Sequence, residues 1–387
     1  MNLNNNDLLS LNKKVKSSQT NFKLKKAAII GLGLIGGSIG LALLHGGLVQ
    51  ELVGYDKNRD AINTALDVGA INQKASDLKE AVEGAEFIIL AVPVGALSTV
   101  AKKITPYLNS QTIVTDTGSV KGPIVKELEE IFKGRALFVG GHPMTGSEQA
   151  GIKAADLYLL ENAVYVLTPT KSTDKKALNI AFDLFEALGS RVITLEPEEH
   201  DIIVAGVSHL PHFLAVSLML NTGKLAKEYD RTLGLAAGGF RDTTRIAGGD
   251  PIMWRDIFLH NQKAILKMLK SWRYEIEKLE EMILKNDTRG MVEVLEQARN
   301  LRSKVPAKKK GLLPTLHELV VTVPDRPGVI GAIASSLGNE GINIIDIEIL
   351  RVREGEGGSI RLGFTTASAA NRAMEILIKS NIKVRKL

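Results

Sequence analysis

The sequence of 387 residues contains no cysteine, and this absence excludes several classes of protein. A scaffold held by disulfides, a catalytic thiolate, and a zinc or iron–sulfur site with cysteine ligands are all ruled out. No uninterrupted apolar run reaches about 18 residues, so we expect no helix that spans a membrane. Together these absences favour a cytoplasmic protein.

Positive charge is scarce outside three short segments, although the net charge of the chain is +6. Residues 1–26, 302–310 and 379–387 hold the basic excess, which leaves the rest of the chain acidic. Basic runs of this kind are typical of solvated tails and linkers. We therefore expect binding to neither nucleic acid nor a membrane surface.

The pattern along the chain indicates a tail followed by several modules. Residues 1–24 are rich in Asn, Lys and Ser, and we expect a disordered tail without a secretory or transit signal. Residues 25–195 alternate apolar strands with helical patterns, which predicts a Rossmann-type, doubly wound α/β sheet of parallel strands covered on both faces. Residues 196–301 show helical patterns only and predict an all-helical domain for substrate binding and dimerisation.

The first segment of the helical domain, Ile202–Leu220, is apolar nearly all round. Such a helix must be buried within its own domain or against a second copy, and we predict a homodimer built on it. Residues 302–315 are basic, contain two prolines and predict a linker. Residues 316–387 follow the order βαββαβ, which is that of a ferredoxin-like module.

A glycine-rich turn after the first strand predicts a dinucleotide site. Gly31, Gly33 and Gly36 form a G-x-G-x-x-G motif that follows a strand and opens a helix. The motif permits a tight turn, a close approach of the backbone to a pyrophosphate, and close packing of helix on strand. Leu34 and Ile35 lie at the helix N-terminus, where N–H groups and the helix dipole favour an anion.

Three further residues define the rest of this site. Asp56 ends the second strand about 20 residues after the motif, where a carboxylate accepts both ribose hydroxyls. Its charge repels a 2′-phosphate and favours NAD over NADP, although Arg59 offers a cation to such a phosphate. Val92 and Pro93 follow the third strand at the carboxyl edge of the sheet, where ligands collect.

Two later strand ends carry unusual polar residues, Ser119 and His142. A histidine at this edge can take a proton from a substrate hydroxyl while the nicotinamide takes hydride from the same carbon. A nearby serine can hydrogen-bond both the hydroxyl and the nicotinamide. Taken alone, His142 is better interpreted as a loop histidine with satisfied hydrogen bonds.

The helical domain adds histidines and arginines. His209 and His212 lack the H-E-x-x-H spacing of a zinc site, so we expect no metal and interpret them as core or substrate-contact residues. Arg241 and Arg245 are four residues apart and would face one anionic ligand if this segment is helical. Surface ion pairing is the alternative and the commonest fate of arginine.

In combination, these motifs resemble the prephenate dehydrogenase family over about residues 26–300. That resemblance implies oxidation of prephenate by NAD⁺ with loss of CO₂, which gives 4-hydroxyphenylpyruvate for tyrosine biosynthesis. It also implies that His142 draws off the proton of the C4 hydroxyl, that Ser119 positions the reacting groups, and that Arg245 binds a substrate carboxylate. The motifs are Gly31–Gly36, Asp116–Lys121, His142–Glu148, Ser208–His212, Gly239–Ala247 and Asp250–Trp254, and the remaining pocket residues implied are Glu148, His209, His212, Arg241 and Trp254.

The last module resembles an ACT domain through its segments 324–328 and 341–344. ACT domains are ferredoxin-like modules that often bind amino acids and pair side by side. The resemblance implies that tyrosine binds here as an effector and lowers activity. The residues implied for the effector site are Asp325, Pro327, Gly328, Asn343 and Ile344.

Three alternatives remain at this point. Arogenate dehydrogenase, or a dual-substrate cyclohexadienyl dehydrogenase, performs the same chemistry on a substrate with a different side chain. A β-hydroxyacid dehydrogenase would need a catalytic lysine in the helical domain, and neither Lys224 nor Lys263 has a suitable context. A non-catalytic amino-acid sensor is disfavoured because Ser119, His142 and Arg245 are all present.

Overall fold

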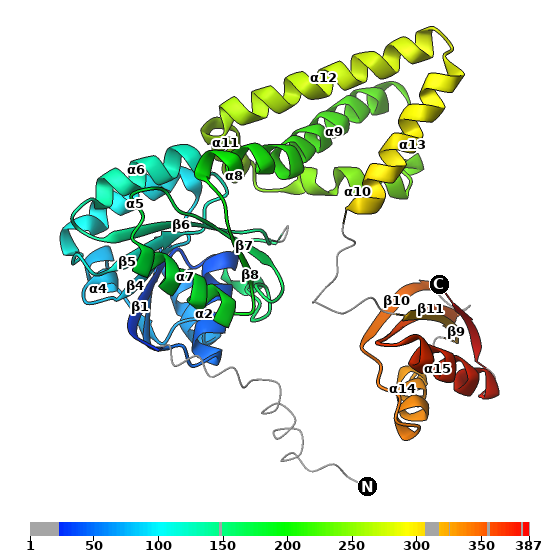
Figure 1. Cartoon of the computed structure of the whole chain (residues 1–387), viewed down its shortest axis with the longest axis horizontal. Coiled ribbons are helices and arrows are strands. Elements are labelled where there is room, and N and C mark those ends of the chain that lie inside the picture. Colours follow the sequence, from blue (N-terminus) through cyan, green and yellow to red (C-terminus); the bar gives the residue numbers. More distant parts are fainter. Residues whose placement is uncertain are drawn as a thin grey trace. The chain divides into compact units, whose positions relative to one another are not determined.

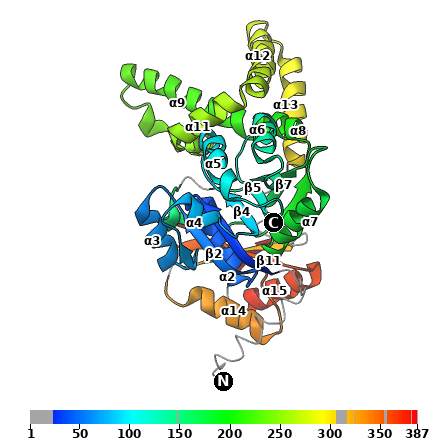
Figure 2. The same ribbon diagram turned by 90° about the vertical axis from the view of Figure 1, so that its left-hand side faces the viewer.

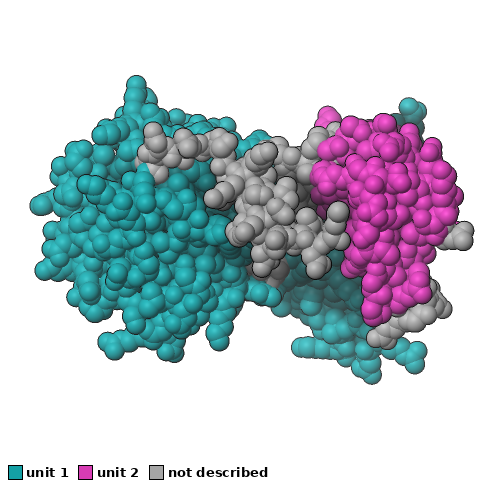
Figure 3. Space-filling view, turned by 90° about the horizontal axis from the view of Figure 1, so that it is seen from below, with its two compact units in different colours: residues 1–295 teal, residues 296–387 magenta. Residues whose placement is uncertain are grey.

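The computed structural model forms two compact units, residues 1–295 and 296–387, which Figure 3 distinguishes by colour. The predicted tail up to residue 22, Glu148 and Asp325 lie outside the described residues. The described residues are 23–146, 149–305, 317–324, 326–353, 357–380 and 382–386.

An eight-stranded sheet forms the centre of the first unit, in the order β3-β2-β1-β4-β5-β6-β7-β8. The order reverses between β1 and β4, which is the switch point where a Rossmann sheet binds its dinucleotide. The predicted fold class is confirmed. The strands are β1 (Leu24–Ile30), β2 (Val49–Tyr55), β3 (Gln73–Lys74), β4 (Phe87–Leu90), β5 (Ile113–Asp116), β6 (Leu137–Pro143), β7 (Val164–Thr168) and β8 (Arg191–Thr194).

One strand pair departs from the predicted parallel arrangement. Strands β6 and β7 are antiparallel, with Gly140 opposite Thr168 and Pro143 opposite Tyr165. A parallel connection needs a crossover, usually a helix, and the described residues between these strands contain only the short 3₁₀ turn η3 (Ile152–Ala154). The chain therefore returns beside β6 in the opposite direction.

Helices cover both faces of the sheet (Figures 1 and 2). Buried side chains such as Ile39 and Phe185 fill one core, and Leu97 and Leu128 belong to the other. Because both faces are covered, the central strand β4 is apolar and buried at every position. The first core contains α2 (Leu34–His45), α3 (Arg59–Asp67) and α7 (Lys175–Ala187), and the second contains α4 (Leu78–Val82), α5 (Leu97–Ile104) and α6 (Gly122–Phe132).

The predicted helical domain follows the sheet. Its last helix continues to Lys304, so three residues that we assigned to the linker are helical. The elements are α8 (Pro197–Val204), the π-helical turn η4 (Ala205–His209), α9 (Leu210–Glu228), η5 (Leu233–Leu235), α10 (Gly238–Thr244), η6 (Arg245–Gly248), α11 (Pro251–His260), α12 (Gln262–Leu284) and α13 (Thr288–Lys304).

The continuous helical stretch Pro197–Glu228 is long and apolar enough to cross a membrane, with a mean hydropathy of 1.7 in its most apolar window. Polar residues interrupt its apolar runs, so the sequence shows no continuous apolar run of about 18 residues there. Core helices of soluble proteins can have the same length and composition, and this stretch also holds buried charged and polar side chains, including Asp201 and His209. Val207 and Leu220 are each 65% exposed, so the stretch is only partly covered within its own unit.

The second unit contains the predicted βαββαβ module. Its four strands form an antiparallel sheet in the order β10-β11-β9-β12, with β9 in the interior. Alternate residues of β9, such as Leu319 and Val321, are buried against Leu337 of α14 and Leu377 of α15 in one apolar core. The elements are β9 (His317–Val323), α14 (Val329–Asn339), β10 (Asp346–Arg353), β11 (Gly357–Phe364), α15 (Ala367–Lys379) and β12 (Lys383–Lys386).

Candidate active site

The glycine-rich loop has the shape that a dinucleotide requires. Gly31 has φ +99°, and a Cβ on it would lie 2.4 Å from the carbonyl oxygen of Ala91. A Cβ on Gly36 would lie 2.0 Å from the oxygen of Gly31, whereas around Gly33 a Cβ would meet no described atom within 4 Å. No side chain among the described residues caps α2, so its first N–H groups, near Leu34 and Ile35, remain available to an anion.

The carboxylate of Asp56 is oriented by two backbone N–H groups. Its Oδ2 accepts from Leu32 and its Oδ1 from Asn58, each at 2.8 Å. Each oxygen keeps a further lone pair, which fits a carboxylate that also accepts ribose hydroxyls. Val92 lies beside the loop, with Cγ1 3.0 Å from the Cβ position of Gly31, and the exposed Pro93 follows it. The residues present therefore fit a dinucleotide.

A buried ion pair joins the ends of β5 and β6. The Nζ of Lys121 donates to the Asp116 carboxylate and, at 2.7 Å, to the carbonyl oxygen of Gly141. The same carboxylate accepts the N–H of Gly118 at 2.8 Å and that of Gly141 at 3.2 Å. Burial lowers the pKa of Lys121, and the charge of Asp116 opposes that shift. The pair fixes the backbone on which Ser119 and His142 are carried.

His142 ends β6 and contacts a histidine that the sequence analysis did not single out. Its Nδ1 lies 2.8 Å from Nε2 of His200 on α8, and His200 Nδ1 lies 2.9 Å from Oδ1 of Asp201. The Asp201 carboxylate accepts the N–H of Lys121 at 2.7 Å and that of Gly122 at 2.8 Å. The available signal was an adjacent His-Asp pair directly before the apolar run that starts at Ile202.

Burial lowers the pKa of His142 well below its ordinary value, and the neighbouring His200, Lys121 and His209 lower it further. The imidazole is therefore neutral at physiological pH, as a general base must be. Ser119 lies half-buried on the loop after β5. The Nδ1 of His142 bonds to His200 rather than to Ser119, so a positioning role for Ser119 remains a prediction.

His209 and His212 are buried around Trp254. The ring of His212 stacks on the indole with centroids 3.5 Å apart and planes 8° apart, and His209 lies edge-on to the indole at 6.1 Å. Burial lowers the pKa of His209 to about 4 and also lowers that of His212. The Nδ1 of His212 is buried without a hydrogen-bond partner in the described part of the chain. A buried ring nitrogen without a partner is a suitable contact for a ligand.

Asn261 connects this cluster to the His142 network. Its Nδ2 lies 2.9 Å from the backbone oxygen of Asp201 and 3.1 Å from Nδ1 of His209. The π-helical turn η4 ends at His209 and sets the direction of that ring; π-turns inside helices are frequent at functional sites. Asn261 was also missed by the sequence analysis.

Arg241 and Arg245 do not share one regular helical turn. The helix α10 ends at Thr244, so Arg241 lies within it, whereas Arg245 opens the 3₁₀ segment η6. Both side chains are exposed. An anion can therefore reach either side chain, and the predicted role of Glu148 concerns a position outside the described residues.

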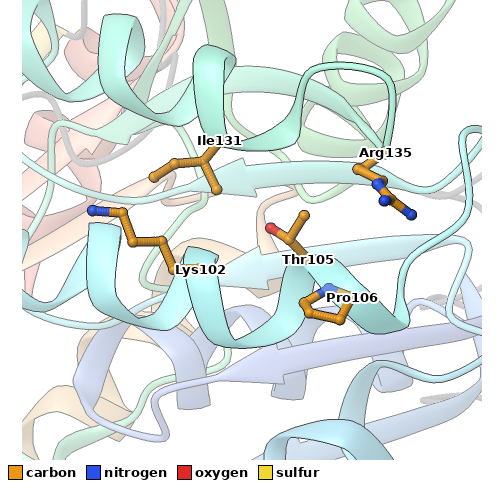
Figure 4. A pocket seen from close by; sticks show the side chains of 5 residues that line it. All are labelled: Lys102, Thr105, Pro106, Ile131 and Arg135. Carbon is orange, nitrogen blue, oxygen red and sulfur yellow. The ribbon is translucent and has the colours of Figure 1, made fainter.

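A separate surface hollow lies between the C-terminal ends of α5 and α6 (Figure 4). Helices run back along the sheet, so these ends lie at the amino edge of β5 and β6, opposite the edge that carries His142. This hollow therefore provides positions for control substitutions. Its lining residues are Lys102, Thr105, Pro106, Ile131 and Arg135.

The effector residues predicted in the second unit are only partly brought together. Gly328 has φ +88° and caps α14, a conformation that favours glycine. Pro327 and Gly328 lie in the turn beside a small pocket, whereas Asn343 and Ile344 are not among its lining residues, and Asp325 lies outside the described residues. The lining residues are Val323, Pro324, Arg326, Val329, Ile330, Ile349, Gly358 and Ile360.

Family models match three successive parts of the chain. Residues 39–194 match the nucleotide-binding domain of prephenate dehydrogenase, residues 196–297 match the dimerization domain of prephenate dehydrogenase, and residues 317–371 match the ACT domain. These matches follow the order of the modules in the fold.

Individual relatives agree with the family models. A prephenate dehydrogenase of Bacillus subtilis is 36% identical over 350 residues, which cover 90% of this chain and 94% of that relative. The crystal structure of prephenate dehydrogenase from A. aeolicus in complex with hydroxyphenyl propionate and NAD⁺ is 35% identical, has a TM-score of 0.70, and covers 74% of this chain and 100% of its own. Synechocystis arogenate dehydrogenase is 32% identical with a TM-score of 0.64 and covers 73% of this chain and 100% of its own. The chain therefore belongs to the prephenate dehydrogenase family, as an NAD-dependent enzyme that carries an ACT domain.

Proposed function

We propose that this enzyme converts prephenate and NAD⁺ into 4-hydroxyphenylpyruvate, CO₂ and NADH. The observation that carries the proposal is the position of His142 near the carboxyl end of β6, at the edge of the sheet that also carries the dinucleotide loop, with its pKa held well below the ordinary value by burial. The direct test is to follow NADH absorbance with prephenate and NAD⁺, using His142→Asn as the inactive control. An absence of NADH formation by the folded protein would contradict prephenate as the substrate, and only a further absence of activity with arogenate would favour the amino-acid sensor.

The proposed reaction begins at the C4 hydroxyl of prephenate. His142 accepts the hydroxyl proton, and bound NAD⁺ would supply the acceptor for the hydride that leaves C4. Loss of the ring carboxylate as CO₂ then makes the ring aromatic, which drives the reaction forward, and the proton held by His142 returns to the phenolate oxygen to give 4-hydroxyphenylpyruvate. We assign to Ser119 the role of orienting the hydroxyl; its position after β5, the strand next to β6, at the same edge of the sheet supports this assignment.

Binding of the substrate requires cations and donors because prephenate is a dianion. We assign one carboxylate to Arg245, whose guanidinium offers bidentate geometry that lysine lacks. Trp254 and the stacked His212 form an aromatic wall, and the buried Nδ1 of His212 supplies a polar contact. Arg241, exposed on the preceding helix α10, is a second candidate cation for the substrate.

Arogenate is the alternative substrate. The similarity to Synechocystis arogenate dehydrogenase favours testing it, since the two substrates differ only in an amino-acid or keto-acid side chain. Four parallel assays, each substrate with NAD⁺ and with NADP⁺, separate the possibilities. We expect a higher kcat/KM with NAD⁺ than with NADP⁺, because Asp56 repels a 2′-phosphate, and the match to prephenate dehydrogenases favours prephenate as the substrate. A higher kcat/KM with arogenate would reassign the substrate.

The ACT domain is proposed to bind tyrosine and reduce activity. Support comes from the family match and from the pocket beside the Pro327–Gly328 turn. Tyrosine is titrated against the full chain and against a chain that ends at Lys304. Inhibition of the full chain alone is expected, whereas equal inhibition of both would place the tyrosine site in the catalytic unit.

A cytoplasmic homodimer is the proposed assembly. The matched dimerization domain contains exposed apolar side chains along η4 and α9, including Val207, Phe213 and Leu220. Burial against a second copy would remove this apolar surface from water. Sedimentation at micromolar concentration should give the dimer mass, and Leu220→Lys should shift the protein toward monomer; a monomeric parent protein would contradict the proposal.

A further inference from the structure

The nitrogen of His142 that bonds within the protein is held by a buried pair on α8. His200 has no exposed surface and Asp201 is 5% exposed, and the proposed mechanism uses neither side chain. We infer that His200 and Asp201 are positioning residues that hold His142 as the tautomer with hydrogen on Nδ1, which leaves Nε2 free to accept the substrate proton. This inference rests on the proposed function, in which His142 is the base.

The backbone N–H groups that bind Asp201 determine which atom donates in each hydrogen bond of the network. The Asp201 carboxylate already accepts two backbone N–H groups, from Lys121 at 2.7 Å and Gly122 at 2.8 Å. An ionised carboxylate only accepts hydrogen bonds, so the His200 Nδ1 at 2.9 Å must carry hydrogen. In the inferred arrangement this is the only hydrogen on the His200 ring, so the lone pair on its Nε2 accepts a hydrogen bond from the His142 Nδ1 at 2.8 Å.

The backbone contacts of Asp201 fix the position of the pair. Lys121 and Gly122 form the N-terminus of α6, so the Asp201 carboxylate binds the end of that helix and holds α8 against it. Asn261 donates to the backbone oxygen of Asp201 from the helical domain. The orientation of a base at the end of β6 is therefore set by residues of the substrate-binding helices.

Several charged or titratable groups face the His142 ring. They are His200 and Asp201 from α8, Lys121 from the start of α6 and His209 from η4. When His142 takes the substrate proton on Nε2, the Nδ1 hydrogen stays in place, and no proton moves along the network. The negative Asp201 favours the resulting imidazolium through His200, as the carboxylate of a catalytic triad does, whereas Lys121 opposes it.

The tautomer is measured directly by ¹⁵N NMR of the holoenzyme labelled at its seven histidines. His142→Asn identifies the His142 signal by its disappearance. We expect Nδ1 in the protonated range and Nε2 in the unprotonated range, and the reverse assignment would overturn the inference. This reading needs no turnover, so it stands apart from any failure of the proposed function.

Steady-state kinetics of His200 variants provide a second test of the inference. His200→Phe keeps a ring but removes the acceptor, so we expect kcat to fall about 10²-fold with KM for prephenate and NAD⁺ nearly unchanged. His200→Gln restores an acceptor and should recover part of kcat. The control His45→Phe replaces an exposed histidine at the end of α2 and should change neither parameter. Wild-type kcat together with an unchanged His142 signal in both folded His200 variants would overturn the inference.

Discussion

Lys121 donates a hydrogen bond from its buried Nζ to the carbonyl oxygen of Gly141 at 2.7 Å, and so joins two neighbouring strand ends. The same ammonium neutralises Asp116, which is also fully buried. We expect Lys121→Met to lower the free energy of unfolding by about 3–5 kcal/mol, because it leaves a buried carboxylate unpaired. Urea denaturation measures this loss.

A matched control for Lys121 lies on the surface. Lys102 pairs with Glu127 at 3.5 Å, and both side chains are largely exposed. Surface pairs contribute only about 0–1 kcal/mol, so Lys102→Met should be nearly neutral. Equal effects of the two substitutions would mean that the Lys121 pair has no special role in holding the site.

Replacement of the base should reduce turnover without loss of binding. His142→Asn removes the proton acceptor and should lower kcat about 10²–10⁴-fold, with KM for prephenate little changed. Steady-state kinetics under saturating NAD⁺ measure both values. A fully active His142→Asn enzyme would remove His142 from the mechanism.

The pH dependence of activity should reflect the lowered pKa of His142. An ordinary histidine titrates near pH ~6.5, but burial, together with the neighbouring His200, Lys121 and His209, lowers the pKa of His142 well below that value. Its neutral form therefore persists at pH 6, and kcat/KM should fall only at more acidic pH. An acid limb centred at pH 6.5 or above, measured in buffers of constant ionic strength, would contradict this environment.

Binding of the substrate carboxylate should depend on Arg245. Arg245→Ala removes bidentate charge recognition and should raise KM for prephenate steeply while the KM for NAD⁺ changes little. Arg135→Ala, at the opposite edge of the sheet, is the control (Figure 4). If KM for prephenate stays normal in Arg245→Ala, the carboxylate binds elsewhere.

Acid should destabilise the fold through its buried histidines. The unfolded chain takes up a proton on His209 near pH ~6.5, whereas the folded chain does so only near a pKa of about 4. Between these values the unfolded state binds more protons, so stability is complete above pH ~6.5 and falls as pH decreases. The loss from His209 is on the order of 3 kcal/mol. Urea titrations should show a shallower decrease for His209→Asn than for the parent chain.

The parts of the fold that were predicted correctly depend on neighbouring residues. The loop from Gly31 to Gly36 and the alternation in β9 are local patterns, set by the backbone freedom of glycine and by the twofold period of a strand. The antiparallel pair β6–β7 was missed because the apolar pattern of a buried strand is the same whether the strand is parallel or antiparallel to its neighbour. Only the lack of a helical crossover between Pro143 and Val164 could have indicated it.

The histidine network was not predicted because its members are far apart in the sequence. His200 is 58 residues from His142, and Asp201 is 80 residues from Lys121. Spacing rules apply within one helix or one strand–helix unit and do not reach such distances. The adjacent His-Asp pair gave no hint of which side chain it would meet.

The sequence by itself determined the modules, the dinucleotide motif and the chemical types of the site residues, because these follow from composition and short-range periodicity. Tertiary structure alone decided which ring nitrogen of His142 bonds to another side chain, and which carboxylate pairs with Lys121. It also decided that Arg241 and Arg245 lie on different helical segments. Those outcomes depend on burial and on hydrogen bonds between distant segments, and such contacts exist only once the sheet and the helices have packed together.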